Sequence, residues 1–566
     1  TGNGNNAFGL DSLGANTTAD GNSAFGHETL LANTTGSENT AIGKEALKAN
    51  TTGANNVAVG ATALDANTTG VDSVAIGVGA LGAQTTGGDN IAIGHLAMSS
   101  LTTAGNNTAV GDRAMQANTS GENNVAVGTL ALDANTTGGS NTAIGRNALG
   151  ANTTASNNTA VGRNALEDNT TGYSNSALGY QAMLQNTTGY NNTGLGYQAM
   201  ANNTTAHNNT AVGYNALVTN TTGDTNTAVG KDAMFSNTTG TNNTALGSRT
   251  LDANTTGTSN VAVGDMALGA NTTANNNVAV GVNALLANST GSENTAVGLN
   301  ALSTNTTATD NTAMGASALA ANTTGDDNAA FGRQSAQANT TGASNSAFGH
   351  QALYTNTTGG GNVAVGRGAL FSNTTGGTNV AIGYQALEDT TPTTTGNNNI
   401  GIGTNVRAAS GTGSNHIIIG QDIDSSANAV AIGKSGNKIQ NNFDTNATWT
   451  RYSDQNLKTN INTTDLGLNF INKLRPITFN WKNSDDFPDG YEGKGKAKMN
   501  TTSTLYGMLA QEVKTALDEV GHSEFGGWSK DSNGTESLAQ SMFIYPLINA
   551  VKELSIKVDE LENKLN

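Results

Sequence analysis

The chain has 566 residues and a formal net charge of −17, and only 12% of its residues are charged and 5% aromatic. Typical soluble domains have about 25% charged residues, so this is not the composition of an ordinary globular enzyme. The sequence has no cysteine, which excludes disulfides and thiolate metal sites, no dense basic patch for nucleic acid, and no apolar run near the ~18 residues that span a bilayer.

A repeat of 17 residues fills the sequence up to residue 433. The alanine of an Ala-(Val/Ile/Leu/Phe/Met)-Gly triplet recurs from Ala7 to Ala381 in steps of 17, with Gly194 replacing alanine once, which gives 23 repeats. Three less regular repeats follow, around residues 401, 418 and 431. A helical-hairpin repeat needs about 33 residues, and each unit here has too few apolar residues for a core of its own, so the repeats must stack.

Each repeat contains one short strand, as residues 57–59 illustrate. Val57 and Val59 share one face of the strand and Ala58 points to the other. Leu64 lies on the return of the chain. We therefore predict that residues 1–433 form a mainly β rod, a parallel β-roll or β-solenoid of 17-residue rungs, roughly 120 Å long at ~4.8 Å per rung. We expect Val59-type and Leu64-type side chains inside, and Ala58 either fits a narrow roll or meets a neighbouring chain.

The recurring Asn-Thr-Thr-Gly, residues 67–70 in this repeat, is typical of a turn, because asparagine bonds its own backbone and glycine accepts positive φ. It also matches the N-glycosylation pattern. Its stacked threonines allow a third reading, an ice-binding array, although Thr68 and Thr69 would face opposite ways in a strand.

The histidines predict no metal site. His27, His95 and His350 share one position of the repeat, but His27 and His95 are four rungs apart, roughly 19 Å, too far for a common ion. We find no phosphate-binding loop, calcium-binding repeat or nucleophile elbow, and we expect no cofactor.

The strand phrases of the repeat, such as Asn428 to Gly433, resemble the head repeats of trimeric autotransporter adhesins. That resemblance implies a trimeric β-roll.

The composition changes after Gly433. Residues 434–452 suggest a connector, and three motifs follow in order: Ser453 to Lys458, Leu474 to Lys482 and Tyr506 to Val513. Together they resemble the intramolecular chaperone domain that ends many bacteriophage tail fibres and tailspikes, here residues 453–566 as a small α+β domain. The resemblance implies a domain that assists trimerisation and then cleaves itself off.

For this chain the resemblance implies that Ser453 is the nucleophile and Lys458 its base, with Ser453–Asp454 as the cleaved bond. A serine needs a base to accept its proton, and a lysine can serve where burial lowers its pKa. The chain has Asn456 where many members of the family have arginine. Any catalysis is thus a single turnover of the domain on itself.

The last residues predict a coiled coil over 547–565, because Val551, Leu554, Val558, Leu561 and Leu565 are spaced by alternating three and four residues. That rule alone favours a dimer, whereas the family resemblance implies a trimer.

We expect a fibre of a virus particle that attaches to a host, assembled in the host cytoplasm and extracellular in the mature virion. The expected partners are two further copies of the chain, other tail components and a host-surface glycan or protein, without nucleic acid or membrane insertion. A bacterial trimeric surface adhesin is the alternative, and it would require membrane-anchoring strands at the C-terminus, where the sequence has the heptad pattern instead.

Overall fold

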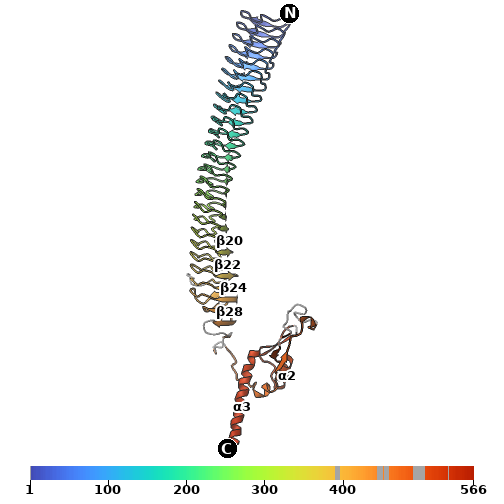
Figure 1. The fold of residues 1–566 in the computed structure, drawn as a ribbon, viewed down its shortest axis with the longest axis vertical. Helices are drawn as coiled ribbons and strands as arrows, with labels where there is room; N and C mark the ends of the chain where they lie inside the picture. Colours follow the sequence, from blue (N-terminus) through green and yellow to red (C-terminus); the bar gives the residue numbers. More distant parts are fainter. Residues whose placement is uncertain are drawn as a thin grey trace. The chain divides into compact units, whose positions relative to one another are not determined.

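The computed structural model describes residues 2–388, 395–442, 450–451, 455, 458–488, 502, 504–532 and 534–565. The chain divides into two compact units, Thr1–Arg451 and Tyr452–Asn566. The first is a rod of stacked coils and the second is a small unit of helices and short strands (Figure 1).

The rod confirms the predicted solenoid of 17-residue rungs. Its first 23 strands have three residues each. They are β1 (Asn6–Phe8), β2 (Ser23–Phe25), β3 (Thr40–Ile42), β4 (Val57–Val59), β5 (Val74–Ile76), β6 (Ile91–Ile93), β7 (Thr108–Val110), β8 (Val125–Val127), β9 (Thr142–Ile144), β10 (Thr159–Val161), β11 (Ser176–Leu178), β12 (Thr193–Leu195), β13 (Thr210–Val212), β14 (Thr227–Val229), β15 (Thr244–Leu246), β16 (Val261–Val263), β17 (Val278–Val280), β18 (Thr295–Val297), β19 (Thr312–Met314), β20 (Ala329–Phe331), β21 (Ser346–Phe348), β22 (Val363–Val365) and β23 (Val380–Ile382).

Neighbouring rungs pair in parallel and in register, so that Ala58 faces Ala41 on one side and Ala75 on the other. The three irregular repeats continue the same sheet as β24 (Ile400–Thr404), β26 (Ile417–Gln421) and β28 (Ala429–Lys434). A second, two-stranded sheet joins β25 (Arg407–Ala408) to β27 (Asp424–Ser425). Within residues 434–452, β29 (Asn437–Asn442) pairs antiparallel with β28, and β30 (Thr450–Arg451) pairs with β29.

The inside of each coil contains alanine and leucine, and the prediction that Val59-type side chains lie inside was wrong. Ala58 and Leu64 are fully buried, whereas Val59 is half-buried and its counterpart Ile42 is 42% exposed. The strand alternates as expected, but the coil is narrow and admits only the small side chain opposite leucine. Where Met183 takes more of this space the strand has Gly194, at which an added Cβ would lie 2.8 Å from the methionine Cγ.

The coil bends through residues with positive φ. Gly60 has φ of 140°, and an added Cβ would lie 2.5 Å from the carbonyl oxygen of Gly77. Leu64 also has positive φ, 51°, which costs a non-glycine residue about 1–2 kcal/mol. Burial of a leucine side chain contributes about 1.5–3 kcal/mol, and the Leu64 N–H donates to the carbonyl oxygen of Ala80 at 3.0 Å. Burial and the hydrogen bond between rungs together offset the strain.

Two ladders of buried asparagine run along the rod. In the first, Asn67 Nδ2 donates to Asn50 Oδ1 of the preceding rung at 2.9 Å and to the carbonyl oxygen of Gly70 at 3.1 Å. In the second, the Asn56 backbone N–H donates to Asn39 Oδ1 at 3.0 Å, and Asn56 Nδ2 donates to the Gly70 carbonyl at 2.9 Å. The Asn-Thr-Thr-Gly segment is therefore the predicted turn, and its asparagine amide is buried in the folded rod.

The two threonines of the turn differ. Thr68 Oγ1 donates to the carbonyl oxygen of Thr85 in the next rung at 2.9 Å, while Thr69 is exposed. The turns thus expose a single file of threonine hydroxyls, and the second file is used in bonds between rungs.

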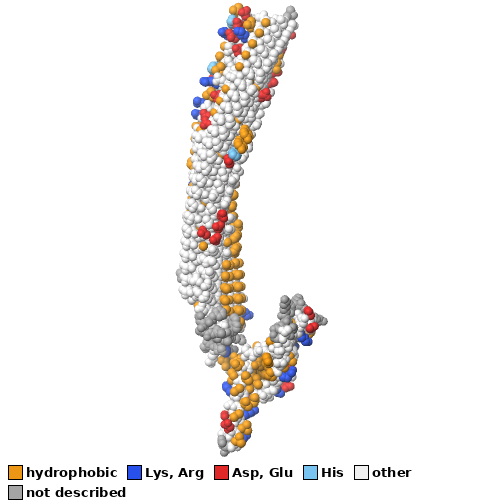
Figure 2. Space-filling view, in the orientation of Figure 1, with side chains coloured by type: hydrophobic (Ala, Val, Ile, Leu, Met, Phe, Trp, Pro, Cys, Tyr) orange, Lys and Arg blue, Asp and Glu red, His pale blue; other side chains and the backbone are white. Residues whose placement is uncertain are grey.

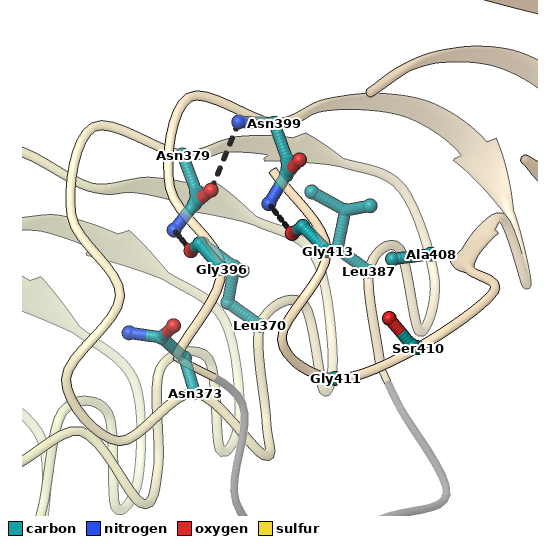
Figure 3. Close-up of a pocket in the computed structure, with 10 residues that line it drawn as sticks. All are labelled: Leu370, Asn373, Asn379, Leu387, Gly396, Asn399, Ala408, Ser410, Gly411 and Gly413. Carbon is teal, nitrogen blue, oxygen red and sulfur yellow. Dashed lines mark hydrogen bonds between the residues drawn. The ribbon is translucent and has the colours of Figure 1, made fainter. Parts of the chain in front are cut away.

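The second ladder continues where the repeat becomes irregular (Figure 3). Asn379 Nδ2 donates to the carbonyl oxygen of Gly396 at 2.9 Å, and the Asn399 N–H donates to Asn379 Oδ1 at 2.9 Å. Asn399 Nδ2 donates in turn to the carbonyl oxygen of Gly413 at 3.1 Å. Leu387 helps to line a cavity of about 20 Å³ beside these residues, which has room for one water molecule. It is a packing gap and too small for a substrate.

The C-terminal unit consists of α1 (Leu468–Ile471), β31 (Ile477–Phe479), η2 (Ser484–Asp486), β32 (Leu505–Gly507), α2 (Ala510–Glu519), β33 (Trp528–Lys530), β34 (Glu536–Leu538), η3 (Gln540–Phe543) and α3 (Ile544–Leu565). Strands β31 and β32 form one antiparallel pair, and β33 and β34 form another. No described helix is both long enough and apolar enough to cross a membrane.

We predict that Asn152→Ala lowers the free energy of local opening of its rung by about 1–3 kcal/mol, because buried polar groups lose their partners. Asn152 Nδ2 donates to Asn135 Oδ1 at 2.9 Å and its Oδ1 accepts from Asn169 Nδ2 at 3.0 Å. Native-state hydrogen exchange measures this change. The matched control is the exposed Thr154→Ala, which should change it little, and equal effects of the two variants would contradict the role of the ladder.

The end of the rod should lose stability in acid because of His416. This histidine takes the place of an asparagine in the second ladder. Its backbone N–H donates to Asn399 Oδ1 at 3.0 Å, and its side chain is buried. Burial lowers the pKa of His416. The unfolded segment, with a histidine pKa of about 6.5, therefore binds a proton first, so stability falls as the pH drops below that value.

Hydrogen exchange of β24, β26 and β28 between pH 7.5 and 5 measures this loss. The His416→Asn variant restores the residue of the ladder and should have a flatter pH dependence. An equally steep dependence in the variant would contradict the assignment to His416.

Candidate functional site

An aromatic cluster holds the C-terminal unit together. Phe470 of α1 packs edge-on against Phe525, with ring centroids 5.8 Å apart, and Phe525 packs edge-on against Phe543 at 5.1 Å. Val513 and Leu517, one turn apart on α2, are buried against the same cluster. This core fixes α2, whose first turn contains part of the third sequence motif.

The second and third sequence motifs meet in space. Their strands β31 and β32 pair antiparallel, with Ile477 opposite Gly507. Next to this pair, Arg475 Nε donates to Glu512 Oε2 at 3.1 Å, and Arg475 Nη2 donates to Glu512 Oε1. A bidentate ion pair thus joins two segments that are 37 positions apart in the sequence.

The ion pair keeps both of its members charged. The hydrogen bond from Arg475 holds the pKa of the Glu512 carboxyl below its ordinary value, and the same bond raises the pKa of Arg475. A carboxylate that stays ionised cannot donate a proton as a general acid at neutral pH. Glu512 also lies in the first turn of α2, where a negative charge is favourable. The ion pair and the place in that turn are contacts by which Glu512 stabilises the unit.

The predicted nucleophile and cleavage bond lie outside the described residues, since neither Ser453 nor Asp454 is among them. Lys458 is described and its side chain is exposed, with its backbone N–H donating to the carbonyl oxygen of Gln455 at 3.2 Å. The roles of Ser453 as nucleophile and Lys458 as base therefore stay predictions.

Sequence reasoning missed how α3 is anchored. Asn549 Nδ2 donates to the carbonyl oxygen of Thr464 at 2.8 Å, and Glu553 Oε2 accepts the backbone N–H of Leu468 at 2.9 Å. These two polar residues are four positions apart and so lie on one face of the helix. In the sequence, a polar pair at that spacing and away from the heptad positions could have indicated a second contact face of the helix.

A search by histidine alone also missed one cluster in the rod. Among the described residues, His27, Glu28 and Glu45 place ligand atoms within 4.8 Å of one another. However, Lys48 Nζ lies 2.5 Å from Glu28 Oε2 and Lys44 Nζ lies 3.2 Å from Glu45 Oε1. Both carboxylates already have cationic partners, so we assign no metal to this cluster.

A protein-family model described as "Chaperone of endosialidase" matches residues 453–522. No curated protein and no solved structure matches the chain. The family match begins at the residue where the sequence motifs begin, and it includes the Arg475–Glu512 ion pair. Together with the β-solenoid rod, it fits a fibre-like or endosialidase-like protein with a C-terminal chaperone domain.

We predict cleavage of the Ser453–Asp454 bond once the chain has assembled, which would release residues 454–566. The reaction requires nucleophile, base and scissile carbonyl within hydrogen-bond distance. Wild-type protein should give two bands on a denaturing gel, whereas Ser453→Ala and Lys458→Ala should each leave one. An intact wild-type chain after assembly would contradict this prediction, and Asn456→Arg would then test whether the arginine common in the family restores cleavage.

Proposed function

We propose that the protein is a homotrimeric fibre of a bacteriophage particle, assembled by its C-terminal domain and used to attach to a host. The observation that carries this proposal is a file of apolar side chains along the outside of the rod. The family match indicates a chaperone domain. The apolar file is a surface that the chains would bury against one another after assembly.

The file consists of the residues at the Val59 position, which is the third residue of each main strand up to β26 and the fourth, Ile432, in β28. All 26 rungs have an apolar residue there, and none of these side chains is fully buried in the single chain. Leu178 is 51% exposed and Phe348 is 40% exposed, for example. Figure 2 shows hydrophobic side chains in such a file beside β20 to β28. Exposed apolar patches larger than a few hundred Å² usually mark an interaction site, and a file that runs the length of a rod fits other rods of the same length.

Helix α3 supports association at the C-terminal end. Its heptad residues are exposed in the single chain, with Val551 at 60%, Leu554 at 51% and Leu561 at 58%. The side chains that anchor the helix to its own unit, Asn549 and Glu553, lie away from these heptad positions. The helix thus has one face for its own domain and an unoccupied seam suited to a parallel coiled coil of residues 547–565. The number of chains in this coiled coil, three and not two, is taken from the resemblance to the chaperone family.

In this proposal the mature fibre is extracellular on the virion, its partners are tail components and a host-surface molecule, and its one reaction is its own cleavage. Release of the chaperone would leave the rods unable to retrace their assembly, which gives kinetic stability. The bacterial trimeric adhesin is the second candidate, and the described repeats suit it equally. The family match at residues 453–522 favours the fibre.

We predict that the triple substitution Ile76→Asp, Ile93→Asp and Val127→Asp prevents association of the rods, because it would bury unpaired charges between chains. In a Ser453→Ala background, which should stay uncleaved, the protein without these substitutions should sediment at three times the chain mass of 57.0 kDa at micromolar concentration, and the triple variant close to one chain. Circular dichroism should stay unchanged, because these side chains lie outside the coil.

The control is Thr69→Asp, Thr86→Asp and Thr103→Asp, which adds the same charge to the exposed threonine file and should remain trimeric. A trimeric apolar-file variant would show that this face is not the interface. A wild-type protein that sediments as a monomer would contradict the trimer itself.

A further inference from the structure

Two columns of side chains flank the apolar file on the outside of the rod. The leading column is the residue three positions before each strand from β1 to β23, and the trailing column is the residue two positions after the same strand. In β15, for example, these residues are Thr241 and Ser248, and Leu246 of the apolar file lies between them in the sequence.

Within one chain, aromatic residues stack along each column. In the leading column, Tyr173, Tyr190 and His207 form one stack, with ring centroids 4.9 and 4.6 Å apart. In the described part of the chain, no ring of this stack contacts a ring of the other column. The trailing column has its own stack in the same three strands, with centroids 5.3 and 5.1 Å apart, formed by Tyr180, Tyr197 and Tyr214.

The two columns carry complementary side chains in the same strands, although they do not meet within one chain. Both are aromatic in β11, β12 and β13, and in β5 both are exposed valines, Val71 at 38% and Val78 at 52%. In none of the strands β1 to β23 do the two columns have like charges. Three of the four acidic residues in the leading column have a basic residue in the trailing column of the same strand: Asp20 with His27, Asp224 with Lys231, and Asp326 with Arg333.

The acid and the base that flank β20 lack charged partners in the single chain. Asp326 and Arg333 are both exposed, and neither forms an ion pair with any described residue. Asp326 Oδ1 accepts only the backbone N–H of Thr309, at 2.8 Å, among the described hydrogen bonds. Asp224 and Lys231, in contrast, each have an oppositely charged side chain nearby in the same chain, at 3.1 and 3.7 Å. The charges at β20 therefore give the clearest sign of a partner outside the chain.

We propose that the leading column of one chain packs against the trailing column of the next chain, strand by strand, when the rods associate. This inference rests on the trimer proposed above and names the contacts between its rods. In a closed ring of parallel chains with the apolar file towards the axis, one side of each outer face meets the opposite side of the next. A closed ring has no shift along its axis, so the two columns meet at the same strand. Antiparallel rods would instead place each column against its own kind.

The matched residues suit such an interface. Tyr173 would meet Tyr180 of the next chain, and aromatic residues are enriched at the centres of interfaces. Asp326 would pair with Arg333 of the next chain, and complementary charges favour one partner and one register. A shift by one strand in either direction would separate these two charges and would leave one tyrosine of the trailing stack without an aromatic counterpart. The columns thus select parallel rods in a single register.

Cross-linking of engineered cysteines tests these contacts, because the chain has no cysteine of its own. The full chain with Ser453→Ala is coexpressed in two forms, one with Thr241→Cys and one with Ser248→Cys, and is treated with a short bismaleimide. We expect covalent pairs of the two forms on a denaturing gel. Either form alone should remain as single chains. Thr241→Cys coexpressed with Leu299→Cys, which lies three strands further along the trailing column, should also give no covalent product.

Sedimentation of the same proteins separates this inference from the trimer. If the protein sediments as a trimer but the coexpressed forms do not cross-link, the contact between the columns is overturned and the trimer stands. Covalent pairs from one form alone would show that a column meets its own kind, and would also overturn the contact. A protein that sediments as a monomer would contradict the trimer and the contact together.

Charge reversal at β20 tests the register in the same Ser453→Ala background. Arg333→Asp would place two acids together at every contact between chains and should lower the temperature at which the trimer dissociates by several degrees, as measured by light scattering. The double variant Asp326→Arg with Arg333→Asp restores opposite charges and should recover most of the loss. The control Arg146→Asp makes the same change beside β9, where the leading column has Gly139, and should have little effect. No recovery in the double variant, or an equal loss in the control, would overturn the pairing by strand.

Discussion

Each rung of the rod depends on the rung beside it, because a coil of 17 residues cannot satisfy its own polar groups. The Asn67 amide is buried, and its hydrogen-bond partners are the preceding rung and its own turn. The Leu64 N–H donates to the next rung as well. A buried amide without partners costs about 1–3 kcal/mol, so an isolated coil would be unstable. The fold is consequently cooperative along its axis, and it tolerates positive φ at a leucine that would be strained alone.

The narrowness of the coil also decides what lies outside. Ala58 fills the inner side of the strand opposite leucine, so the branched residue at the Val59 position has to face outward. A rod whose inside accepts only small side chains thus acquires an apolar outer file as a direct result of strand alternation. The same geometry that stabilises the single chain leaves a surface that water covers poorly, which connects the fold of one chain to the association proposed for several.

Much of this architecture could be predicted from the sequence, and the errors have physical causes. The period of 17, the strands and the turn at Asn67 follow from local patterns. Alternation separates Val59 from Ala58, but which of them lies inside depends on the width of the coil, and no local pattern contains that width. In the C-terminal unit, the ion pair of Arg475 with Glu512 joins distant segments, and only the folded chain brings them together. The roles of Ser453 and Lys458 rest on family resemblance alone.

The uniform register between rungs makes the repeat an interchangeable unit. Because most rungs present the same ladder of amides and the same strand to both neighbours, with exceptions such as Ser73 and Leu101, gain or loss of one whole repeat in the gene would leave most remaining contacts intact. The spacing from Val380 to Ile400 shows that even a longer coil keeps the pairing of its strand. The length of the rod can therefore evolve in steps of one rung, independently of the C-terminal unit.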